Sequence, residues 1–229
     1  MSASELADER LDVPLERERL LRDRVEARLL AAITSGRMRS GQLYSAPTLA
    51  DQLGVSATPV REAMVNLSRR GLVIVEQRKG FRVVDVTPDE LRQSIVLREI
   101  LEGGAMARLA GALPVADSEE LYDQADEIVA TADAGDIENY LTVDRRFHLR
   151  LLGYLRNPRL TEIVGDLRLT TRLVGISSRV GTEEFHASNR EHRELLDHLY
   201  AGRADQARSL MEKHVRHSLG VWAGVDEAE

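Results

Sequence analysis

Residues 49–73 read LADQLGVSATPVREAMVNLSRRGLV, and the spacing of apolar residues in this stretch indicates how the N-terminal part of the chain folds. Its first five residues have the pattern of a short helix, which Gly54 ends. Ser56 is a suitable cap for a second helix, with Pro59 in its first turn. Two short helices around a tight glycine-containing turn are typical of a helix-turn-helix, which places its second helix in the major groove of DNA.

The sequence on both sides of this stretch extends the motif to a winged helix-turn-helix. Apolar residues recur at helical spacing between positions 25 and 33, which predicts a preceding helix. Two β-branched runs, 72–75 and 81–84, flank a polar, glycine-bearing tip, which predicts a β-hairpin, the wing. We therefore predict a DNA-binding head over residues 20–86. The alternative is an unrelated three-helix module followed by an unconnected hairpin.

The charge distribution also favours a nucleic-acid partner for this head. Residues 20–84 contain eleven basic and five acidic residues, although the whole chain has a net charge of −7. A basic module joined to an acidic body is typical of a protein with one part that contacts a polyanion, and a solvated arginine-rich face is the alternative. The expected DNA contacts are Ser56, Thr58, Pro59 and Arg61 at the start of the second helix, and Arg78, Lys79 and Gly80 at the wing tip.

The overall composition limits the class of protein. The chain has 229 residues, of which 43% are apolar and 30% charged, a balance typical of folded proteins. Cysteine is absent, which excludes disulfides and thiolate metal sites. No window is apolar enough for a membrane span, and the polar, acidic start does not have the order of a secretory signal. We expect a cytoplasmic protein without a membrane partner, and a disordered tail over residues 1–19.

Residues 87–223 are predicted to form an all-α bundle of about six helices. Thr87, Pro88 and Glu90 have the pattern of a proline-containing capping box at the start of the first helix. Proline and glycine then separate the helices at 113–114, 135–136, 157–158, 181–182 and 202. The predicted fold class is thus mainly α, with an N-terminal winged helix-turn-helix, a C-terminal bundle and a short tail over residues 224–229.

Ionisable side chains with metal-ligand chemistry are predicted to face the centre of this bundle. Asp144 and His148 lie four residues apart, on the apolar stripe of the third bundle helix. His192 and His214 lie on the inward stripes of the fifth and sixth helices. Burying such groups is costly unless they are paired or bind a cation. Imidazoles with one carboxylate suit a divalent metal ion, zinc first, with nickel, manganese or iron as alternatives.

Other interpretations of these residues remain open. An Asp and a His one turn apart are also typical of a simple hydrogen bond, and an inward His is often a satisfied core residue. The four residues therefore form either a metal site or a structural histidine cluster without metal. His217, three residues after His214, is an alternative ligand on the same helix.

The sequence of the head resembles a known protein family. The stretch at 49–73, followed by the wing sequence RKGFRV at 78–83, is similar to the GntR family of bacterial transcription regulators. The resemblance covers residues 20–86 and implies binding to double-stranded DNA. One departure concerns Ala57, because the family often has Arg between the Ser and the Thr of the turn. A base or phosphate contact of the relatives is therefore missing here.

The body resembles the FCD ligand-binding domain of the FadR subfamily. The similar stretches are LREILEGGAMARLAGAL at 97–113, DRRFHLRLLGYLRNPRL at 144–160 and SNREHRELLDHLYAGRADQARSLMEKHV at 188–215. Members that bind metal hold it with one Asp and three His, which by position are Asp144, His148, His192 and His214. The resemblance also implies a small organic-acid or sugar-acid effector. About six helices is closer to the VanR-like branch than to the FadR branch.

The effector is expected to bind at the metal, where four protein ligands leave coordination positions open. Arg98 lies on an inward stripe and is a candidate to bind an acid's second carboxylate. A salt bridge from Arg98 to Glu102, one turn along, is an equally good interpretation. Arg172 and Asn189 are further candidate effector-binding residues.

Two functions follow from these observations. The first is a homodimeric transcription regulator, a repressor or an activator, that reads a palindromic operator and responds to an acid bound at the metal. The second is a metal-dependent hydrolase or lyase with an accessory winged helix. An enzyme is not expected, because the sequence has no H-E-x-x-H pattern and no obvious inward Glu near the ligands to act as a general base.

Overall fold

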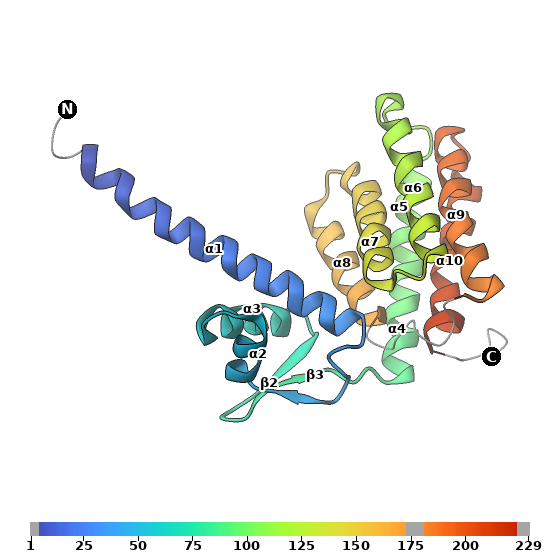
Figure 1. Cartoon of the computed structure of the whole chain (residues 1–229). Helices are drawn as coiled ribbons and strands as arrows, with labels where there is room; N and C mark the ends of the chain where they lie inside the picture. Colours follow the sequence, from blue (N-terminus) through green and yellow to red (C-terminus); the bar gives the residue numbers. More distant parts are fainter. Residues whose placement is uncertain (1–4, 173–180, 224–229) are drawn as a thin grey trace. The chain divides into compact units, whose positions relative to one another are not determined.

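The computed structural model describes the backbone of residues 5–172 and 181–223, and the side chains of residues 19–171 and 181–217. The chain divides into two compact units, Met1–Val84 and Asp85–Glu229. The division lies two residues before the predicted end of the head. Figure 1 labels most of the helices and strands of the two units.

The first unit is a winged helix-turn-helix, as predicted. Its elements are α1 (Glu5–Thr34), β1 (Leu43–Tyr44), α2 (Ala46–Leu53), α3 (Ala57–Arg69), β2 (Val73–Glu76) and β3 (Gly80–Val83). The three strands form an antiparallel sheet in the order β1-β3-β2, in which β2 and β3 are the predicted hairpin. Strand β1 was not predicted, because two residues are too short to show the alternation typical of a strand.

Helix α1 packs against α3 through apolar side chains. Leu29 and Ile33 of α1 are buried, as is Leu67 of α3. The backbone of α1 begins at Glu5, within the segment that the sequence predicts to be a disordered tail. Glu, Leu and Arg, which are frequent in this segment, have high helix propensity.

The second unit is a helical bundle. Its elements are α4 (Pro88–Arg98), the π-helix η1 (Glu99–Gly103), α5 (Gly104–Leu109), the 3₁₀ turn η2 (Val115–Asp117), α6 (Ser118–Asp133), α7 (Ile137–Gly153), α8 (Pro158–Arg172), α9 (Glu183–Tyr200) and α10 (Ala204–Ala223). Helices α4, η1 and α5 follow one another without a break and form one long helix. The described part of the bundle therefore has the expected six long helices.

The sequence signals at the helix ends explain these boundaries. Thr87 accepts a hydrogen bond from the backbone N–H of Glu90, whose side chain accepts from the backbone N–H of Thr87, so the predicted capping box is formed. Gly135 and Gly202 have positive φ angles of 68° and 69°, a conformation that favours glycine, and they end α6 and α9. Within the described ranges, every helix is too short or too polar to span a bilayer.

The centre of the bundle is unusual because it contains charged groups as well as apolar ones. Phe147, Phe185 and Leu151 are among its fully buried side chains. Buried beside this apolar core are ionisable residues from α4, η1, α7, α8 and α9: Arg98, Glu102, Asp144, His148, Arg168, Glu191 and His192. Burial of so many ionisable groups requires specific partners, which define the site.

Candidate functional site

The four predicted metal ligands converge on one point in the bundle core. Asp144 and His148 come from α7, His192 from α9 and His214 from α10. Each offers one ligand atom, and these atoms all lie within 4.8 Å of one another. Asp144, His148 and His192 are buried, and His214 is half-buried. The structure thus brings the four predicted residues together, and their role as metal ligands stays a prediction.

Three of the four ligand atoms, those of Asp144, His148 and His192, lie at distances that fit a small divalent cation. Nε2 of His148 and Nε2 of His192 are 3.0 Å apart, and Oδ1 of Asp144 lies 3.5 Å from the first and 3.3 Å from the second. Tetrahedral zinc with bonds of about 2.0–2.1 Å separates its ligands by about 3.3 Å. The donor set of three imidazoles and one carboxylate also suits such an ion.

The hydrogen bonds of the imidazoles also fit a cation at the centre of the four side chains. Nδ1 of His192 lies 2.9 Å from the main-chain oxygen of Asn189, so Nδ1 carries the hydrogen and the lone pair of Nε2 faces the cluster, where it accepts from Nε2 of His148 at 3.0 Å. Nδ1 of His148 is buried and has no hydrogen-bond partner among the described residues; Oε2 of Glu102 is 3.8 Å away. A cation on Nε2 of His148 would place the ring hydrogen on Nδ1, toward that carboxylate.

The imidazoles of His148 and His214 are neutral at pH 7, because the pKa of each lies below its usual value. Burial is the main reason that the pKa of His148 lies well below its usual value, and the positive charge of Arg168 adds to it. Burial also lowers the pKa of His214 to about 4, against the opposing effect of Glu191. Neutral imidazoles are the form that binds metals.

A buried ion network holds Asp144 in place. Arg168 of α8 donates to Oδ2 of Asp144 at 2.9 Å and to Oε2 of Glu102 at 2.6 Å. Arg98 donates through Nε to Oε1 of Glu102 at 2.7 Å. Burial alone raises the pKa of Glu102, but Arg168 and Arg98 outweigh it and lower this pKa to about 2. Glu102 is therefore ionised and connects the long first helix of the bundle to α8.

A second buried carboxylate lies on the other side of the histidines. Glu191 of α9 contacts Nδ1 of His214 at 3.1 Å, Nδ1 of His217 at 3.2 Å and Nζ of Lys213 at 2.9 Å. The expectation of no inward Glu near the ligands was therefore wrong, since Glu102 and Glu191 are both buried there. Both carboxylates are held by positive or hydrogen-bonding groups that lower their pKa, which makes them poor general bases.

The three candidate effector residues have different surroundings. Arg98 is buried and forms the salt bridge with Glu102, the alternative that the sequence left open, and it also donates to Oγ1 of Thr171 at 3.3 Å. The side chain of Arg172 lies outside the described residues. Asn189 is 1% exposed, and neither atom of its amide has a hydrogen-bond partner among the residues that the structure describes. A buried, unpaired amide is costly unless a ligand or water contacts it.

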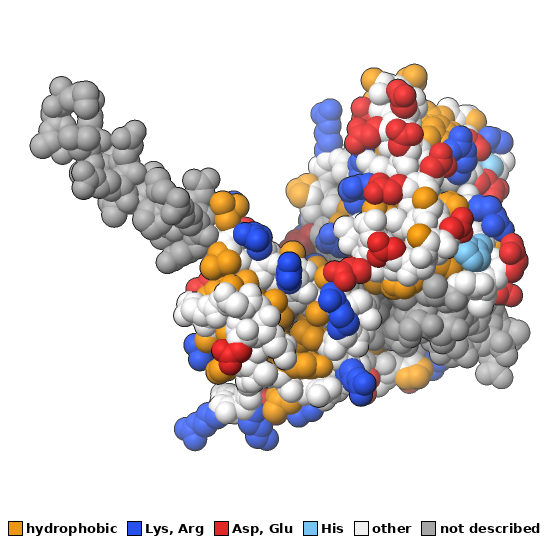
Figure 2. Space-filling model, in the orientation of Figure 1, with side chains coloured by type: hydrophobic (Ala, Val, Ile, Leu, Met, Phe, Trp, Pro, Cys, Tyr) orange, Lys and Arg blue, Asp and Glu red, His pale blue; other side chains and the backbone are white. Residues whose placement is uncertain are grey.

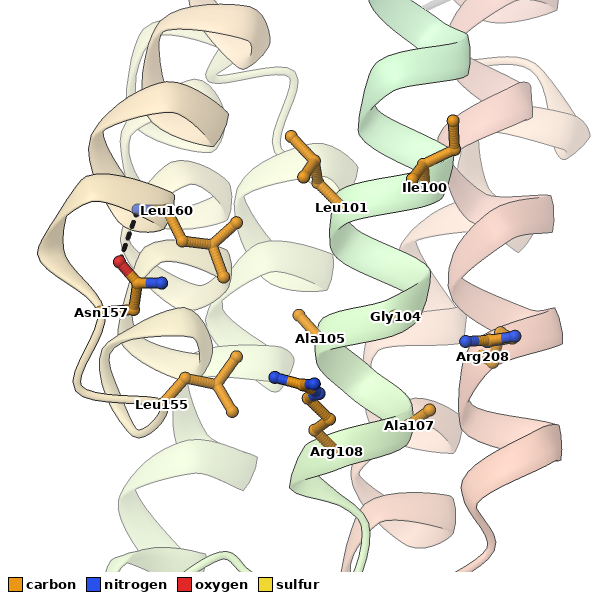
Figure 3. A pocket seen from close by; sticks show the side chains of 10 residues that line it. All are labelled: Ile100, Leu101, Gly104, Ala105, Ala107, Arg108, Leu155, Asn157, Leu160 and Arg208. Carbon is orange, nitrogen blue, oxygen red and sulfur yellow. Dashed lines mark hydrogen bonds between the residues drawn. The ribbon is translucent and has the colours of Figure 1, made fainter.

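A separate groove of about 500 Å³ lies along the long first helix. Asp144, His148, His192 and His214 do not line it. In Figure 3, Leu101 and Arg108 face Leu155 and Leu160 across the groove, whereas Ile100 and Arg208 lie on the other side of the helix. The groove is therefore a surface feature of the bundle, distinct from the cluster.

On the head, the start of α3 presents part of the predicted DNA-contact set. Ser56 is the N-cap, and Ser56, Thr58 and Arg61 are exposed. Pro59 is buried, so its side chain packs in the head and is not available to DNA. Gly54 ends α2 with a φ of 67°, which produces the tight turn between the two helices. The polar side chains at the first turn of α3 remain candidates for base and phosphate contacts.

The wing tip presents two basic side chains. Arg78 and Lys79 are exposed, and Figure 2 shows basic side chains at the hairpin end of the head. Gly80 has a structural reason of its own, because a Cβ atom there would lie 2.3 Å from the main-chain oxygen of Tyr44. Glycine is needed at this position for β1 and β3 to approach each other, whether or not its backbone also contacts DNA.

Sequence reasoning missed two residues that contact the cluster. Arg168 follows Val164 and precedes Thr171 at helical spacing, and all three are buried, so the inward stripe of α8 could have identified it. Glu191 lies one turn before the buried Leu195 and could have been identified in the same way.

Comparison with protein families assigns both units. The description "Bacterial regulatory proteins, gntR family" applies to the match over residues 21–83, and "FCD domain" to the match over residues 93–217. An uncharacterised HTH-type transcriptional regulator of Streptomyces ambofaciens is 32% identical over 181 residues, which cover 77% of this chain and 74% of that protein. A probable D-xylose utilization operon transcriptional repressor of Paenarthrobacter nicotinovorans is 29% identical, covering 87% and 89%.

Solved structures agree on the fold. Escherichia coli McbR/YncC matches with a TM-score of 0.80 at 24% identity, over 89% of this chain and 97% of that one. A GntR transcriptional regulator from Rhodococcus sp. RHA1, described as putative, matches with a TM-score of 0.68 at 24% identity, over 90% and 98%. At these identities the likeness concerns the fold, and the assignment depends on the family matches.

Proposed function

Because the chain belongs to the GntR family of bacterial transcription regulators and carries an FCD domain, we propose that it is a homodimeric regulator controlled by a small carboxylic acid at a divalent metal. The observation that carries this proposal is the convergence of Asp144, His148, His192 and His214 in the bundle core. When bound, the metal supplies a positive centre that attracts an anionic effector. The relatives are DNA-binding regulators, so the hydrolase or lyase alternative is not retained.

The chain's own residues define the chemistry of the effector. Arg168 and Arg98 place two buried guanidinium groups next to Glu102 and Asp144, which makes the surroundings of the cluster polar. The unpaired amide of Asn189 offers a donor and an acceptor. A small organic or sugar acid, with one carboxylate and further hydroxyl or carboxylate oxygens, matches these groups. Zinc is the first candidate for the metal.

The DNA-binding side of the proposal concerns α3 and the wing. Ser56, Thr58 and Arg61 would contact the major groove, and Arg78 and Lys79 would contact phosphate or the minor groove. Acid binding would then alter the relative populations of conformations with high and low operator affinity. The proposed sign of regulation is repression, which is supported by the relative from Paenarthrobacter nicotinovorans, a probable repressor. Such a protein acts on the chromosome and hence in the cytoplasm.

Metal content and operator affinity test the proposal together. The protein is purified without chelator or nickel column, its metal is quantified, and its operator is selected from random duplexes. We expect about one metal per chain, and operator affinity that changes with an acid from a carboxylate library only in the metal-loaded protein. Less than about one metal per two chains, with unfolding unchanged by added metal, would favour a structural histidine cluster.

Arg61→Ala tests the DNA interface. Loss of an arginine that contacts a base edge costs about 1–3 kcal/mol, so operator affinity should fall about 5- to 150-fold in fluorescence anisotropy, with metal content unchanged. Arg159→Ala is the matched control, because Arg159 is an exposed arginine of the bundle paired with Glu162. Equal losses in both variants would indicate a general charge effect. Affinity that stayed constant as salt rises would contradict a phosphate-dominated interface.

The proposed dimer has a candidate face on the long first bundle helix. Val96, Leu97 and Ile100 are exposed apolar residues on α4 and η1, and Ile100 is 65% exposed. Leu101 and Leu155 line the groove of Figure 3 on the side of the helix away from Ile100. Two copies that bury Val96, Leu97 and Ile100 against each other would give the two-fold symmetry that a palindromic operator requires.

Ile100→Glu is expected to weaken self-association. A charge buried in such an interface is costly, so the dimer dissociation constant should rise about tenfold or more in sedimentation equilibrium, and operator affinity should fall with it. Val115→Glu is the control, because Val115 is 79% exposed and lies in η2, away from this helix. If both variants remain dimeric to the same extent as the unmodified protein, the interface lies elsewhere.

A further inference from the structure

Glu191 is a buried carboxylate that pairs, among the described side chains, with three residues of the neighbouring helix α10. It lies on α9, directly before His192, and is 6% exposed. Its Oε2 atom accepts from Nδ1 of His214 at 3.1 Å and lies 3.2 Å from Nδ1 of His217, whereas its Oε1 atom contacts Nζ of Lys213 at 2.9 Å. The DNA-binding and effector roles described above do not use this residue.

The contact with His214 determines which ring nitrogen is available to a metal. An ionised carboxylate accepts a hydrogen bond, so Nδ1 of His214 carries the ring hydrogen and Nε2 keeps its lone pair. His192 has the same arrangement, but its Nδ1 donates to the main-chain oxygen of Asn189. The backbone therefore orients one imidazole, and a side chain that can be replaced orients the other.

We propose that Glu191 is a positioning residue of the metal site, which orients His214 and fixes its tautomer without binding the metal. The inference rests on the metal site of the proposed function. Glu191 lies outside the group of four converging ligands, and its two oxygens are occupied by α10. A carboxylate behind a metal-bound imidazole strengthens that ligand, and its loss weakens metal affinity by about 10- to 100-fold.

The alternative is that Glu191 has only a structural role, as a salt bridge that joins α9 to α10. The contact on Oε1 distinguishes the two roles, because Lys213 pairs with Glu191 across α9 and α10 and is not one of the four candidate ligands. Lys213→Gln removes that ion pair and leaves the hydrogen bond between Glu191 and His214. Glu191→Gln preserves side-chain size and an acceptor oxygen but removes the negative charge from behind the imidazole.

The experiment compares zinc affinity of the full-length protein and these two variants by competition with a chromophoric chelator. Glu191→Gln should bind zinc about 10- to 100-fold more weakly, and Lys213→Gln within about threefold of the unmodified chain. Nitrogen NMR of the metal-free proteins gives a second readout, because His214 should have its hydrogen on Nδ1 in the unmodified chain and in Lys213→Gln, and a mixture of tautomers in Glu191→Gln. A structural salt bridge would not change this signal.

The other outcomes would contradict either the positioning role of Glu191 or the metal site itself. If the zinc affinity and the tautomer of His214 are unchanged in Glu191→Gln, the positioning role is overturned while the metal site remains. Equal losses of affinity in both variants would also overturn it, in favour of helix pairing. Failure of the unmodified protein to bind zinc, nickel, manganese or iron would instead contradict the metal site itself. Circular dichroism of each variant checks that the helical content is preserved.

Discussion

Arg168→Leu should destabilise the metal-free bundle by about 3–5 kcal/mol. Arg168 is 3% exposed and neutralises two buried carboxylates, Glu102 and Asp144, which would be left with fewer partners. Removal of one partner from a buried ion pair typically costs this amount, because a charge then remains in a low-dielectric environment. Asp144 has the larger share of the loss, since Glu102 keeps its contact with Arg98. Chemical denaturation of the full-length protein measures the change.

The control for this prediction is a salt bridge on the surface of the same bundle. Arg146 of α7 pairs with Glu127 of α6, and both side chains are substantially exposed. Arg146→Leu should therefore change the free energy of unfolding by less than about 1 kcal/mol. A metal bound at Asp144 would replace part of the missing charge, so zinc should stabilise Arg168→Leu more than it stabilises Arg146→Leu. Equal destabilisation of the two metal-free variants would contradict a special role for the buried network.

Elements with a repeating signal could be predicted from the sequence. The helix-turn-helix, the hairpin and the six long helices follow from apolar periodicity and from caps such as Thr87 and Gly54. Asp144 and His148 could be selected as candidate ligands because they interrupt an apolar stripe of α7. Periodicity shows that a residue faces inward, and the side-chain type then shows whether it can bind a metal.

Pairing between distant residues could not be predicted in the same way. Arg98 and Glu102 are one turn apart, so their salt bridge was among the alternatives, whereas Arg168 meets Glu102 across 66 residues of sequence. Periodicity gives the face of each helix but not the neighbour across the core. The burial of Pro59 shows a related limit, because position in a motif does not establish that a side chain is exposed.

Zinc should stabilise the bundle strongly, and His148→Ala should remove most of this effect. A ligand at about 1,000 times its dissociation constant stabilises the folded state by about 4 kcal/mol. For a protein of this size, that corresponds to a rise of about 8–16 °C in the midpoint of thermal unfolding. His148 is central to the cluster, with contacts to His192 and Asp144. If its loss weakens zinc binding 100-fold, about 2.7 kcal/mol of the stabilisation disappears.

The comparison within each variant, with and without zinc, separates metal binding from the direct effect of the substitution on the core. His186→Ala is the matched control, because His186 is a histidine of α9 that pairs with Asp133 outside the cluster; it should keep the full response to zinc. His148→Ala should also lose the acid response while retaining most of its operator affinity, the reverse of Arg61→Ala. A zinc response that persisted in His148→Ala but not in His186→Ala would place the metal near His186 and Asp133 instead of at the cluster.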